Sequence, residues 1–335
     1  MIKIAINGFG RIGRHACKVA WEKKGIQVVA INDLTDTRTL AHLLKYDTAY
    51  QDFAHRVEYD EEHLIIDGKK IKTSAEKEPS KLPWGKLGID VVVESTGVFT
   101  SKEKAAAHLA AGAKRVIISA PAKGEGVKTY VRGVNCESYK DELIIDNASC
   151  TTNSAAPVAE VMERSFGIEK GMLTTIHSYT ADQNLQDGPH KDLRRARAAA
   201  QNMVPTSTGA AKATAKVIPS LVGKFDGLSV RVPTITVSLT DFTFVLKKTV
   251  TKEQVNMVLD KASRTYLKGI LDVTNEPLVS SDFIGNTHSS IVDAEFTLVV
   301  GGNLVKVLAW YDNEWGYANR LVEMAEKVGK TLKKK

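Results

Sequence analysis

The chain has 335 residues, more than one hydrophobic core usually organises, so its length predicts two domains. Hydrophobic residues make up 43% and charged residues 25%, which excludes a disordered chain. No apolar run is long enough to cross a membrane, and the first residues read as a strand and not as a signal peptide, so we expect a cytoplasmic protein without a membrane partner. Only three cysteines occur, without a CxxC pair or metal-ligand spacing, and we therefore expect neither a disulfide framework nor a bound metal.

The net charge of +7 makes a nucleic-acid or surface partner a secondary hypothesis. Basic residues are dispersed along the chain except in KDLRRAR at 191–197 and KTLKKK at 330–335. The second cluster is expected to be a solvated helix end, where the helix dipole favours cationic side chains. The first cluster is either a solvated face or a binding site, and composition alone does not decide between them.

The first 148 residues alternate between predicted strands and helices. Short apolar runs predict strands at 2–6, 26–33, 90–96, 115–120 and 142–146. Helical spacing predicts helices at 11–25 and 37–46. Thr100 and Glu103 have the spacing of a capping box for a third helix, which Gly112 ends. Since strands separated by helices run parallel, residues 1–148 are expected to form a Rossmann-type, doubly wound α/β domain.

The second half has long alternating stretches, which predict an antiparallel sheet with one packed face and one polar face. They lie at 230–246, 290–300 and 304–311. Thr251 and Gln254 are spaced to cap a helix that runs to about Lys268. We expect residues 149–313 to form an α+β catalytic domain with a mainly antiparallel sheet, and a terminal helix at about 314–335 to pack back on the first domain.

The first chemical signal is INGFGRIG, in which Gly8, Gly10 and Gly13 form a GxGxxG motif. The motif joins a predicted strand to a predicted helix, and Asp33 ends the next strand about 20 residues later. In this setting the glycines let the backbone approach a pyrophosphate, and the carboxylate binds ribose hydroxyls. Because a carboxylate repels a 2′-phosphate, NAD is favoured over NADP, although Arg38 leaves that preference open. The alternative is a glycine-rich turn without a ligand.

Cys150 lies in DNASCTTNSAAP, after the strand predicted at 142–146 and at the start of a predicted helix. The thiol would then lie at the carboxyl edge of the sheet, where open α/β sheets bind ligands. A helix N-terminus stabilises the thiolate, so we expect the pKa of Cys150 to be lowered. The alternative is a buried structural cysteine, which is the commoner role of an isolated thiol.

Among eight histidines, His177 is distinguished by its place at the end of the apolar run MLTTIHS. This position at a strand terminus makes it a candidate base for Cys150. The pairing is spatial, and the residues alone leave it open.

Six motifs follow one another along nearly the whole chain: INGFGRIGR at the start, SCTTN at 149–153, HSYTADQ at 177–183, PTSTGAAKA at 205–213, RVPT at 231–234 and WYDNEWGY at 310–317. Through them the chain closely resembles the phosphorylating glyceraldehyde-3-phosphate dehydrogenases. The resemblance implies oxidative phosphorylation of D-glyceraldehyde 3-phosphate to 1,3-bisphosphoglycerate with NAD and inorganic phosphate, a step of glycolysis and gluconeogenesis.

The resemblance also implies roles for individual residues. It makes Cys150 the nucleophile, which forms a hemithioacetal and then a thioacyl enzyme, and His177 its acid–base partner. It assigns the substrate phosphate to Thr180 and Arg231. It assigns the attacking phosphate to Ser149, Thr151, Arg195, Thr208 and Gly209. It assigns the cofactor to Gly8, Gly10, Arg11, Ile12, Gly13, Asp33, Lys77, Ser119 and Asn313.

Three positions depart from the family's pattern. Ser154 stands where many members carry a second cysteine, and Ala181 and Gly188 stand where some bacterial members carry asparagine and leucine near the cofactor. Ser154 removes a nearby thiol that could form a disulfide under oxidation and should leave turnover intact. Ala181 and Gly188 put the detailed NAD affinity in doubt, but not the reaction type. Family members are usually homotetramers in which the segment with KDLRRAR reaches toward a neighbour's cofactor, and we expect the same here. Two alternatives stay open: a related enzyme acting on erythrose 4-phosphate or another aldehyde, and a non-enzymic binding role.

Overall fold

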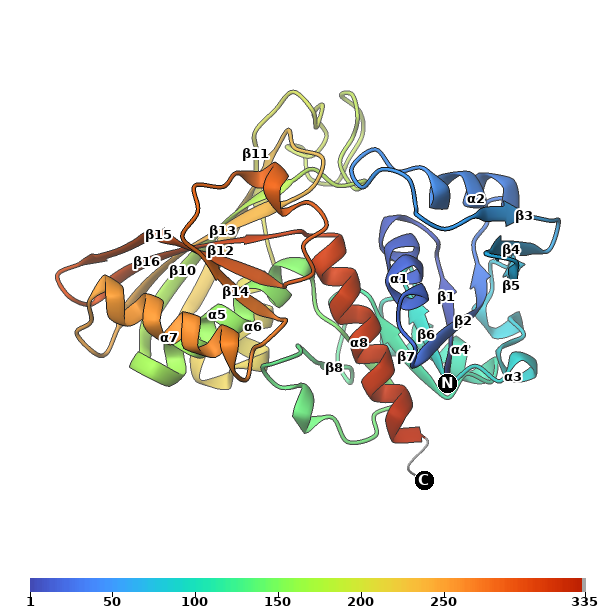
Figure 1. Ribbon diagram of the computed structural model, residues 1–335, viewed down its shortest axis with the longest axis horizontal. Helices are drawn as coiled ribbons and strands as arrows, with labels where there is room; N and C mark the ends of the chain where they lie inside the picture. The colour runs from blue at the N-terminus through green and yellow to red at the C-terminus, as the bar shows by residue number, and fades with distance from the viewer. Residues whose placement is uncertain (333–335) are drawn as a thin grey trace. The chain divides into compact units, whose positions relative to one another are not determined.

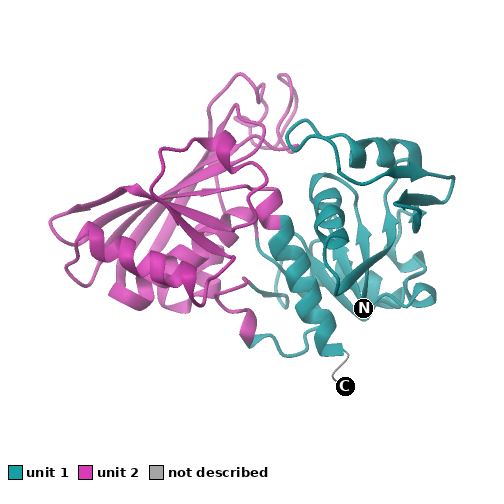
Figure 2. Ribbon diagram, in the orientation of Figure 1, with its two compact units in different colours: residues 1–130, 138–148, 318–335 teal, residues 131–137, 149–317 magenta. Residues whose placement is uncertain are grey.

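The structure is a computed structural model that describes residues 1–332, so the last three lysines of the expected basic tail lie outside the described residues. The chain divides into two compact units, coloured separately in Figure 2. Unit 1 contains Met1–Tyr130, Ser138–Ala148 and Ala318–Lys335, and unit 2 contains Val131–Glu137 and Ser149–Tyr317. The short segment Val131–Glu137 therefore belongs with the second unit, which the change of sequence pattern does not indicate.

Unit 1 is built on a nine-stranded sheet with the order β3-β4-β5-β2-β1-β6-β7-β9-β8. Its central strands pair in parallel: β1 (Ile2–Asn7), β2 (Ile26–Asn32), β6 (Val91–Glu94), β7 (Arg115–Ile118) and β9 (Ile144–Asp146). At one edge β5 (Lys69–Ser74) pairs in parallel with β2, and β3 (Val57–Tyr59) and β4 (His63–Ile66) continue from it antiparallel. At the other edge lies β8 (Lys128–Thr129). The parallel core confirms the expected doubly wound class.

The helices of unit 1 begin close to where the sequence predicts them, except for a short helix at 84–87 that was not predicted. They are α1 (Arg11–Trp21), α2 (Thr37–Lys45), α3 (Trp84–Leu87), α4 (Lys102–Ala110) and α8 (Trp315–Leu332), of which Ala318 onward belongs to this unit. The predicted cap of α4 is wrong by one residue, because Ser101 and not Thr100 accepts a hydrogen bond from the backbone N–H of Lys104. Gly112 closes that helix region with φ +96°, a conformation that favours glycine.

Helix α8 packs within unit 1 through small residues. A Cβ atom on Gly329 would come within 2.4 Å of the Ile2 side chain, so the helix lies directly against the first strand. Lys23 and Glu323 add an ion pair at 3.8 Å. None of the helices within residues 1–332 is long and apolar enough to span a membrane.

Unit 2 contains a seven-stranded mixed sheet with the order β11-β12-β10-β13-β16-β15-β14. The strands are β10 (Ile168–Ser178), β11 (Val204–Ser207), β12 (Phe225–Val232), β13 (Ser238–Leu246), β14 (Leu271–Thr274), β15 (Ser290–Val300) and β16 (Leu304–Tyr311). Most neighbouring pairs are antiparallel, as expected, whereas β10 pairs in parallel with β12 and β14 with β15. The helices α5 (Cys150–Phe166), α6 (Ala210–Val217) and α7 (Lys252–Arg264) lie against one face of this sheet (Figure 1).

Two predictions for unit 2 need correction. The single stretch predicted at 230–246 is two strands, β12 and β13, which lie on opposite sides of β10. The chain breaks between them because Pro233 has no N–H to donate and Val237 adopts φ +69°. The capping box of Thr251 and Gln254 is confirmed, but α7 ends at Arg264, about one turn before the predicted end.

Candidate active site

Cys150 is the first residue of α5, the helix that follows the loop after β9. Ser149 caps this helix, since its side chain accepts a hydrogen bond of 3.1 Å from the backbone N–H of Thr152. The preceding residue, Ala148, has φ +56°, which is uncommon for a residue other than glycine. The predicted location of the thiol at a helix N-terminus is confirmed.

His177 reaches the thiol from the end of β10. Its Nε2 atom lies 3.5 Å from the Sγ atom of Cys150, so the structure brings the two predicted catalytic residues together. Its Nδ1 atom lies 2.6 Å from the backbone carbonyl of Ser178. Because a carbonyl oxygen only accepts, Nδ1 carries the ring proton and Nε2 presents its lone pair to the sulfur. The imidazole is therefore oriented as a base toward the thiol.

The pKa values of this pair differ from the expectation. Burial raises the pKa of Cys150, although the positive charge of Arg231 and a hydrogen bond with Thr151 act in the opposite direction. Burial and the same arginine lower the pKa of His177 to about 3. The predicted lowering of the thiol pKa is thus wrong for this structure, because the loss of solvation outweighs the nearby favourable charge. Both groups are neutral at pH 7, and the sulfur must lose its proton during its attack.

Tyr311, at the end of β16, contacts residues on both sides of the Cys150–His177 pair. It was not predicted as a site residue from the sequence. Its hydroxyl lies 3.0 Å from Oγ1 of Thr151 and 2.8 Å from Oγ1 of Thr175, so it joins the first turn of α5 to β10. Its ring meets that of His177 edge-on, with centroids 6.0 Å apart. Burial raises the pKa of Tyr311, so the phenol stays protonated. The motif WYDNEWGY contains this residue, but only the tertiary contacts reveal its role.

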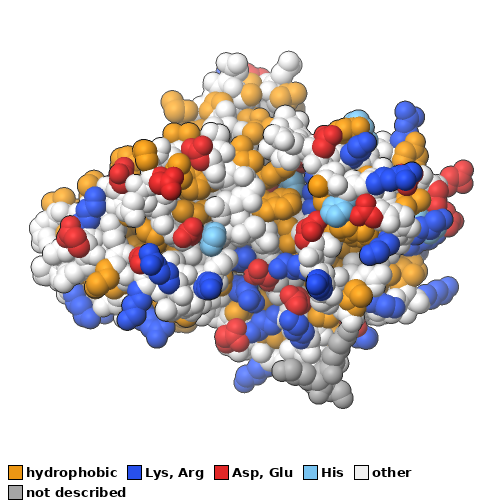
Figure 3. All heavy atoms as spheres, viewed as in Figure 1, with side chains coloured by type: hydrophobic (Ala, Val, Ile, Leu, Met, Phe, Trp, Pro, Cys, Tyr) orange, Lys and Arg blue, Asp and Glu red, His pale blue; other side chains and the backbone are white. Residues whose placement is uncertain are grey.

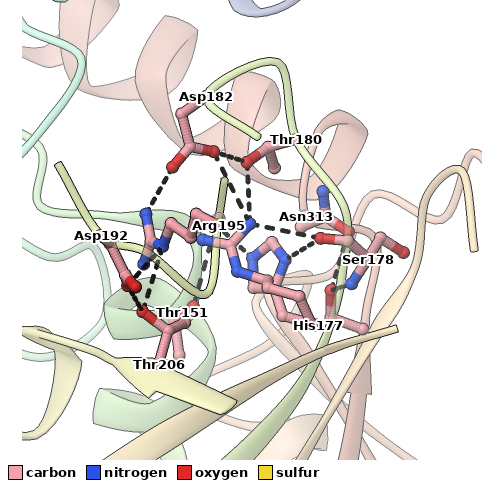
Figure 4. A network of polar contacts seen from close by, with 12 residues as sticks. Thr151, His177, Ser178, Thr180, Asp182, Asp192, Arg195, Thr206 and Asn313 are labelled. Carbon is pink, nitrogen blue, oxygen red and sulfur yellow. Dashed lines mark hydrogen bonds and ion pairs between the residues drawn. The ribbon is translucent and has the colours of Figure 1, made fainter. Parts of the chain in front are cut away.

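Asp182, a carboxylate that was not predicted from the sequence, joins the predicted phosphate-binding residues. Figure 4 shows it between Thr180 and Arg195. Asp182 accepts hydrogen bonds from Thr180 and Arg195, and Arg231 lies 4.0 Å from it. Arg231 in turn donates to Oγ1 of Thr180 at 2.8 Å. Burial opposes ionisation of Asp182, but Thr180 and the two arginines together lower its pKa. Two cationic side chains and a hydroxyl therefore converge near Cys150, as anion recognition requires.

Arg195 connects this centre to the segment before α6. It donates to Oγ1 of Thr206 at 3.1 Å and to the carbonyl of Ser207 at 3.3 Å, beside Thr208 and Gly209. Gly209 is the N-terminal cap of α6 and has no side chain, but Oγ1 of Thr208 accepts a hydrogen bond of 3.2 Å from the backbone N–H of Ala210. Within the described part of the chain, no hydrogen bond links this group to Ser149 or Thr151. That both groups hold one phosphate stays a prediction.

Unit 1 contains a cavity of about 500 Å³ at the carboxyl ends of its parallel strands. Four of the predicted cofactor residues line it: Gly8, Gly10, Asp33 and Lys77. The other lining residues are Asn7, Asn32, Leu34, Glu76, Ser95, Thr96, Val98 and Phe99. Predicted residues that do not line it are Arg11, which pairs with Asp47 at 2.7 Å, together with Ile12, Gly13 and Ser119.

The glycine turn of this cavity fits a dinucleotide. Gly8 has φ +90°, and a Cβ atom there would lie 2.6 Å from the backbone nitrogen of Thr96. A Cβ atom on Gly13 would lie 2.1 Å from the carbonyl oxygen of Gly8, so these two glycines are required by packing. In contrast, a Cβ atom on Gly10 would meet no other atom within 4 Å, and no side chain caps α1. The open first turn of α1 can therefore receive a pyrophosphate.

The remaining predicted cofactor residue, Asn313, belongs to unit 2. Ser238 accepts a hydrogen bond from the backbone N–H of Ser178 and donates to Oδ1 of Asn313 at 2.9 Å. This contact fixes the orientation of the amide, because its nitrogen must point away from Ser238. A role of Asn313 in cofactor binding stays a prediction. No group of three potential metal ligands occurs among residues 1–332.

The positions that depart from the family's pattern have separate surroundings. Ser154 is buried within α5 and donates to Ser290 at 3.4 Å. Ala181 is exposed, and a Cβ atom on Gly188 would lie 3.1 Å from the amide nitrogen of Asn184. Among the described residues, none of these three side chains forms a hydrogen bond with the side chain of Cys150 or His177, so the departures leave the hydrogen bonds of the reacting groups unchanged.

Comparison with known proteins gives a consistent result along the chain. Residues 2–102 match the family model of the glyceraldehyde 3-phosphate dehydrogenase NAD binding domain, and residues 149–313 match that of the C-terminal domain. Glyceraldehyde-3-phosphate dehydrogenase of Thermotoga maritima is 59% identical over 329 residues, covering 97% of this chain and 98% of the relative. Glyceraldehyde-3-phosphate dehydrogenase 1 of Bacillus cereus is 56% identical, with the same shares covered. The chain belongs to the glyceraldehyde-3-phosphate dehydrogenase family of NAD-dependent oxidoreductases.

Proposed function

We propose that this protein oxidises D-glyceraldehyde 3-phosphate to 1,3-bisphosphoglycerate, with NAD as hydride acceptor and inorganic phosphate as acyl acceptor. The observation that carries the proposal is the approach of the unprotonated Nε2 atom of His177 to the thiol of Cys150 at 3.5 Å. A neutral thiol beside a neutral, oriented base is suited to attack on an aldehyde carbon.

In the first step, the sulfur forms a bond to the aldehyde carbon while His177 takes the thiol proton. The imidazolium then protonates the developing oxyanion and gives a hemithioacetal on Cys150. The backbone N–H of Cys150, at the open end of α5, is the proposed oxyanion donor. His177 is neutral again after this step, because the proton has passed from sulfur to oxygen.

In the second step, His177 removes the hydroxyl proton of the hemithioacetal, the C–O bond becomes a carbonyl, and the C–H bond breaks so that its hydrogen leaves as hydride with the bonding electron pair. NAD, when bound, supplies the acceptor for that hydride. The product on Cys150 is a thioester. Inorganic phosphate attacks its carbonyl carbon, the C–S bond breaks, and the departing sulfur recovers its proton from His177, which completes the cycle.

The charges near the thiol support two anion pockets. We assign the phosphate of the substrate to Thr180 and Arg231, which are already joined at 2.8 Å. We assign the attacking phosphate to Ser149, Thr151, Arg195, Thr208 and Gly209. Asp182 bridges the two arginines and partly neutralises them, so an arriving phosphate competes with this carboxylate for the same donors.

The cavity of unit 1 is the proposed NAD site. It presents the Asp33 carboxylate for ribose hydroxyls and the open first turn of α1 for the pyrophosphate. Arg11, Ile12, Gly13 and Ser119 are proposed as supporting residues, and Asn313 as a contact of the nicotinamide amide. We propose residues 1–148 as the NAD-binding domain, with the terminal helix at about 314–335 packing back on it, and residues 149–313 as the catalytic domain.

We also propose that the protein is a cytoplasmic homotetramer. The segment between β10 and β11 exposes large apolar side chains, with Leu185 81%, Leu193 81% and Met203 75% accessible. Such exposure is costly unless another chain covers it, so it supports self-association. Sedimentation equilibrium tests the assignment: a single species of four chains supports it, and a stable monomer contradicts it.

A nucleic-acid or surface partner remains only a secondary proposal. On the face shown in Figure 3, basic and acidic side chains are interspersed, whereas a nucleic-acid surface normally gathers positive charge. In the basic cluster at 191–197, Arg195 and Arg197 are already paired with Asp182 and Asp187. Binding that persists after Cys150→Ala and weakens steeply with salt would support such a role.

The main test is NADH formation from glyceraldehyde 3-phosphate and NAD, with and without phosphate. Wild type should produce NADH in multiple turnovers only when phosphate is present, and Cys150→Ala should produce none. Multiple turnovers without phosphate would mean that water is the acyl acceptor. Erythrose 4-phosphate should be run in parallel, since a higher kcat/KM for that aldehyde would favour the alternative substrate.

A further inference from the structure

Glu94, at the carboxyl end of β6, is a buried carboxylate beneath the cavity of unit 1, with 1% of its surface exposed. Its Oε2 atom accepts hydrogen bonds from Nδ2 of Asn7 at 2.6 Å and Nε2 of His108 at 2.9 Å. Its Oε1 atom accepts from the backbone N–H and the hydroxyl of Thr96. No lysine or arginine of the described chain forms an ion pair with it. A buried carboxyl group that four hydrogen bonds hold without a lysine or arginine partner calls for an explanation.

The neighbouring histidine, His108, donates a hydrogen bond to Glu94. The indole N–H of Trp84 donates to Nδ1 of His108 at 3.0 Å, so Nδ1 is the acceptor nitrogen. The ring proton of His108 is therefore on Nε2 and points at Glu94. The two oxygens of Glu94 therefore accept from four donors: the amide of Asn7, the ring N–H of His108, and the backbone N–H and hydroxyl of Thr96. In this arrangement Glu94 acts only as a hydrogen-bond acceptor.

One oxygen of Glu94 directs a chain of amides toward the cavity. Asn7 donates to Glu94, and its Oδ1 atom accepts from Nδ2 of Asn32 at 2.7 Å. Asn32 then binds the backbone of Glu76 twice: it donates to the carbonyl oxygen at 2.9 Å and accepts from the N–H at 2.9 Å. The carboxylate of Glu94 accepts at one end of this chain, and the backbone N–H of Glu76 donates at the other end. Together they orient both amides so that each NH₂ group points toward Glu94 and each amide oxygen points toward Glu76.

The other oxygen supports the glycine turn. The backbone nitrogen of Thr96, which donates to Glu94 at 2.8 Å, lies against Gly8, where a Cβ atom would come within 2.6 Å. Ser95 adds a hydrogen bond of 2.7 Å to the carbonyl oxygen of Gly8. One carboxylate therefore holds both walls of the cavity: the turn at Gly8 and the Glu76 segment, which continues into Lys77.

We propose that Glu94 is a positioning residue of the cofactor pocket. Its two acceptor oxygens set the orientation of the amides of Asn7 and Asn32, and they hold the Glu76–Lys77 segment and the glycine turn in the shape that binds the cofactor. The proposal rests on the assignment of this cavity to NAD. Glu94 itself is covered by Asn7 and Thr96 and acts through them.

The discriminating variant is Glu94→Gln, which keeps the shape but replaces one oxygen by an NH₂ group. Whichever way the new amide turns, its NH₂ group faces an N–H donor: those of Asn7 and His108 in one orientation, and the backbone N–H of Thr96 in the other. We expect the dissociation constant of NAD, measured by titration calorimetry, to rise about tenfold or more. We also expect faster hydrogen exchange in the peptide containing residues 75–78, because the Glu76 N–H loses its oriented acceptor.

Asp90→Asn is the matched control. Asp90 is a buried carboxylate that precedes the same strand, at the end remote from the cavity, where it accepts from Lys3 N and Lys114 Nζ. The Asp90→Asn variant should keep the wild-type NAD affinity and the wild-type hydrogen exchange of residues 75–78. The proposal is overturned if Glu94→Gln binds NAD within twofold of wild type with unchanged exchange there, or if the two variants weaken NAD binding equally.

Two further variants make every outcome informative. If Glu94→Gln does not fold, Asn32→Ser tests the far end of the amide chain: weaker NAD binding with faster exchange at 75–78 supports the proposal, and wild-type values overturn it. Asp33→Ala tests the cavity independently of Glu94. If Asp33→Ala weakens NAD binding but Glu94→Gln does not, only the positioning role fails, whereas unchanged binding in both overturns the pocket assignment and this proposal together.

Discussion

The Sγ atom of Cys150 lies 3.5 Å from the one nitrogen of His177 that carries no proton. The structure therefore presents a thiol and a base that are correctly oriented but both neutral. Burial produces this state, because it raises the pKa of the thiol and lowers that of the imidazole. The sulfur becomes a strong nucleophile only when its proton moves to Nε2 of His177, which occurs as the sulfur attacks the aldehyde.

Arg231→Leu should slow alkylation of Cys150. Burial dominates both pKa values, but the positive charge of Arg231 lowers the pKa of Cys150 and that of His177. Removing this charge raises both pKa values, so less thiolate is present at pH 8. The rate of reaction with iodoacetamide at that pH should fall by up to about tenfold, and the rate–pH profile should move to higher pH.

Arg197→Leu serves as the control, since Arg197 is exposed and pairs with Asp187 at 2.7 Å. This variant should keep the wild-type profile. An unshifted profile for Arg231→Leu would show that its charge does not act on the thiol.

His177→Asn should reduce the sensitivity of the protein to acid. The pKa of His177 is about 3 in the folded chain, below the usual value near 6.5 for an unfolded chain. The unfolded state therefore binds a proton first, and stability present above pH 6.5 is lost as the pH falls toward 3. Between pH 7 and pH 5, urea unfolding should show about 2 kcal/mol less loss for the variant than for wild type. Equal losses would contradict the low pKa.

Tyr311→Phe should weaken both folding and catalysis. The change leaves Oγ1 of Thr151 and of Thr175 without their shared hydroxyl partner in a buried place. The expected loss is about 1–3 kcal/mol in the free energy of unfolding, with a lower kcat because the first turn of α5 carries Cys150. Urea unfolding and steady-state assays measure the two effects.

Tyr266→Phe is the comparison for that variant. Tyr266 is 45% exposed and donates to Glu160 at 2.9 Å, so the removal of its hydroxyl should cost less than about 1 kcal/mol and leave kcat unchanged. Similar effects of the two substitutions would mean that Tyr311 has no special role.

Arg195→Leu should separate the two half-reactions. Arg195 binds Asp182, Thr206 and the carbonyl of Ser207, and it is assigned to the attacking phosphate. The single-turnover burst of NADH should keep its amplitude, whereas the KM for phosphate should rise at least about tenfold, as expected for the loss of a charge-assisted pair. The neighbouring Arg194, which is exposed, provides the control substitution Arg194→Leu. Loss of the burst itself would place Arg195 in the first half-reaction.

Local sequence patterns predicted much of unit 1 because its elements are short and clearly separated. The apolar run before Gly8 and the helical spacing after Gly10 correspond to β1 and α1. The same reasoning joined 230–246 into one strand, because alternation continues through the break at Pro233. It did not single out β3 to β5, whose pairing adds an edge to the sheet.

The amino-acid sequence by itself determined the order of the elements, the glycine turn, and the residue types needed for a thiol-based reaction at Cys150. These features depend on neighbours along the chain, through periodicity, capping and the conformational freedom of glycine. Only the tertiary structure decided the pairing of Cys150 with His177, the direction of their pKa shifts, and the roles of Tyr311, Asp182 and Glu94. Those properties arise from burial and from hydrogen bonds between residues far apart in sequence. A local sequence pattern cannot predict either of them.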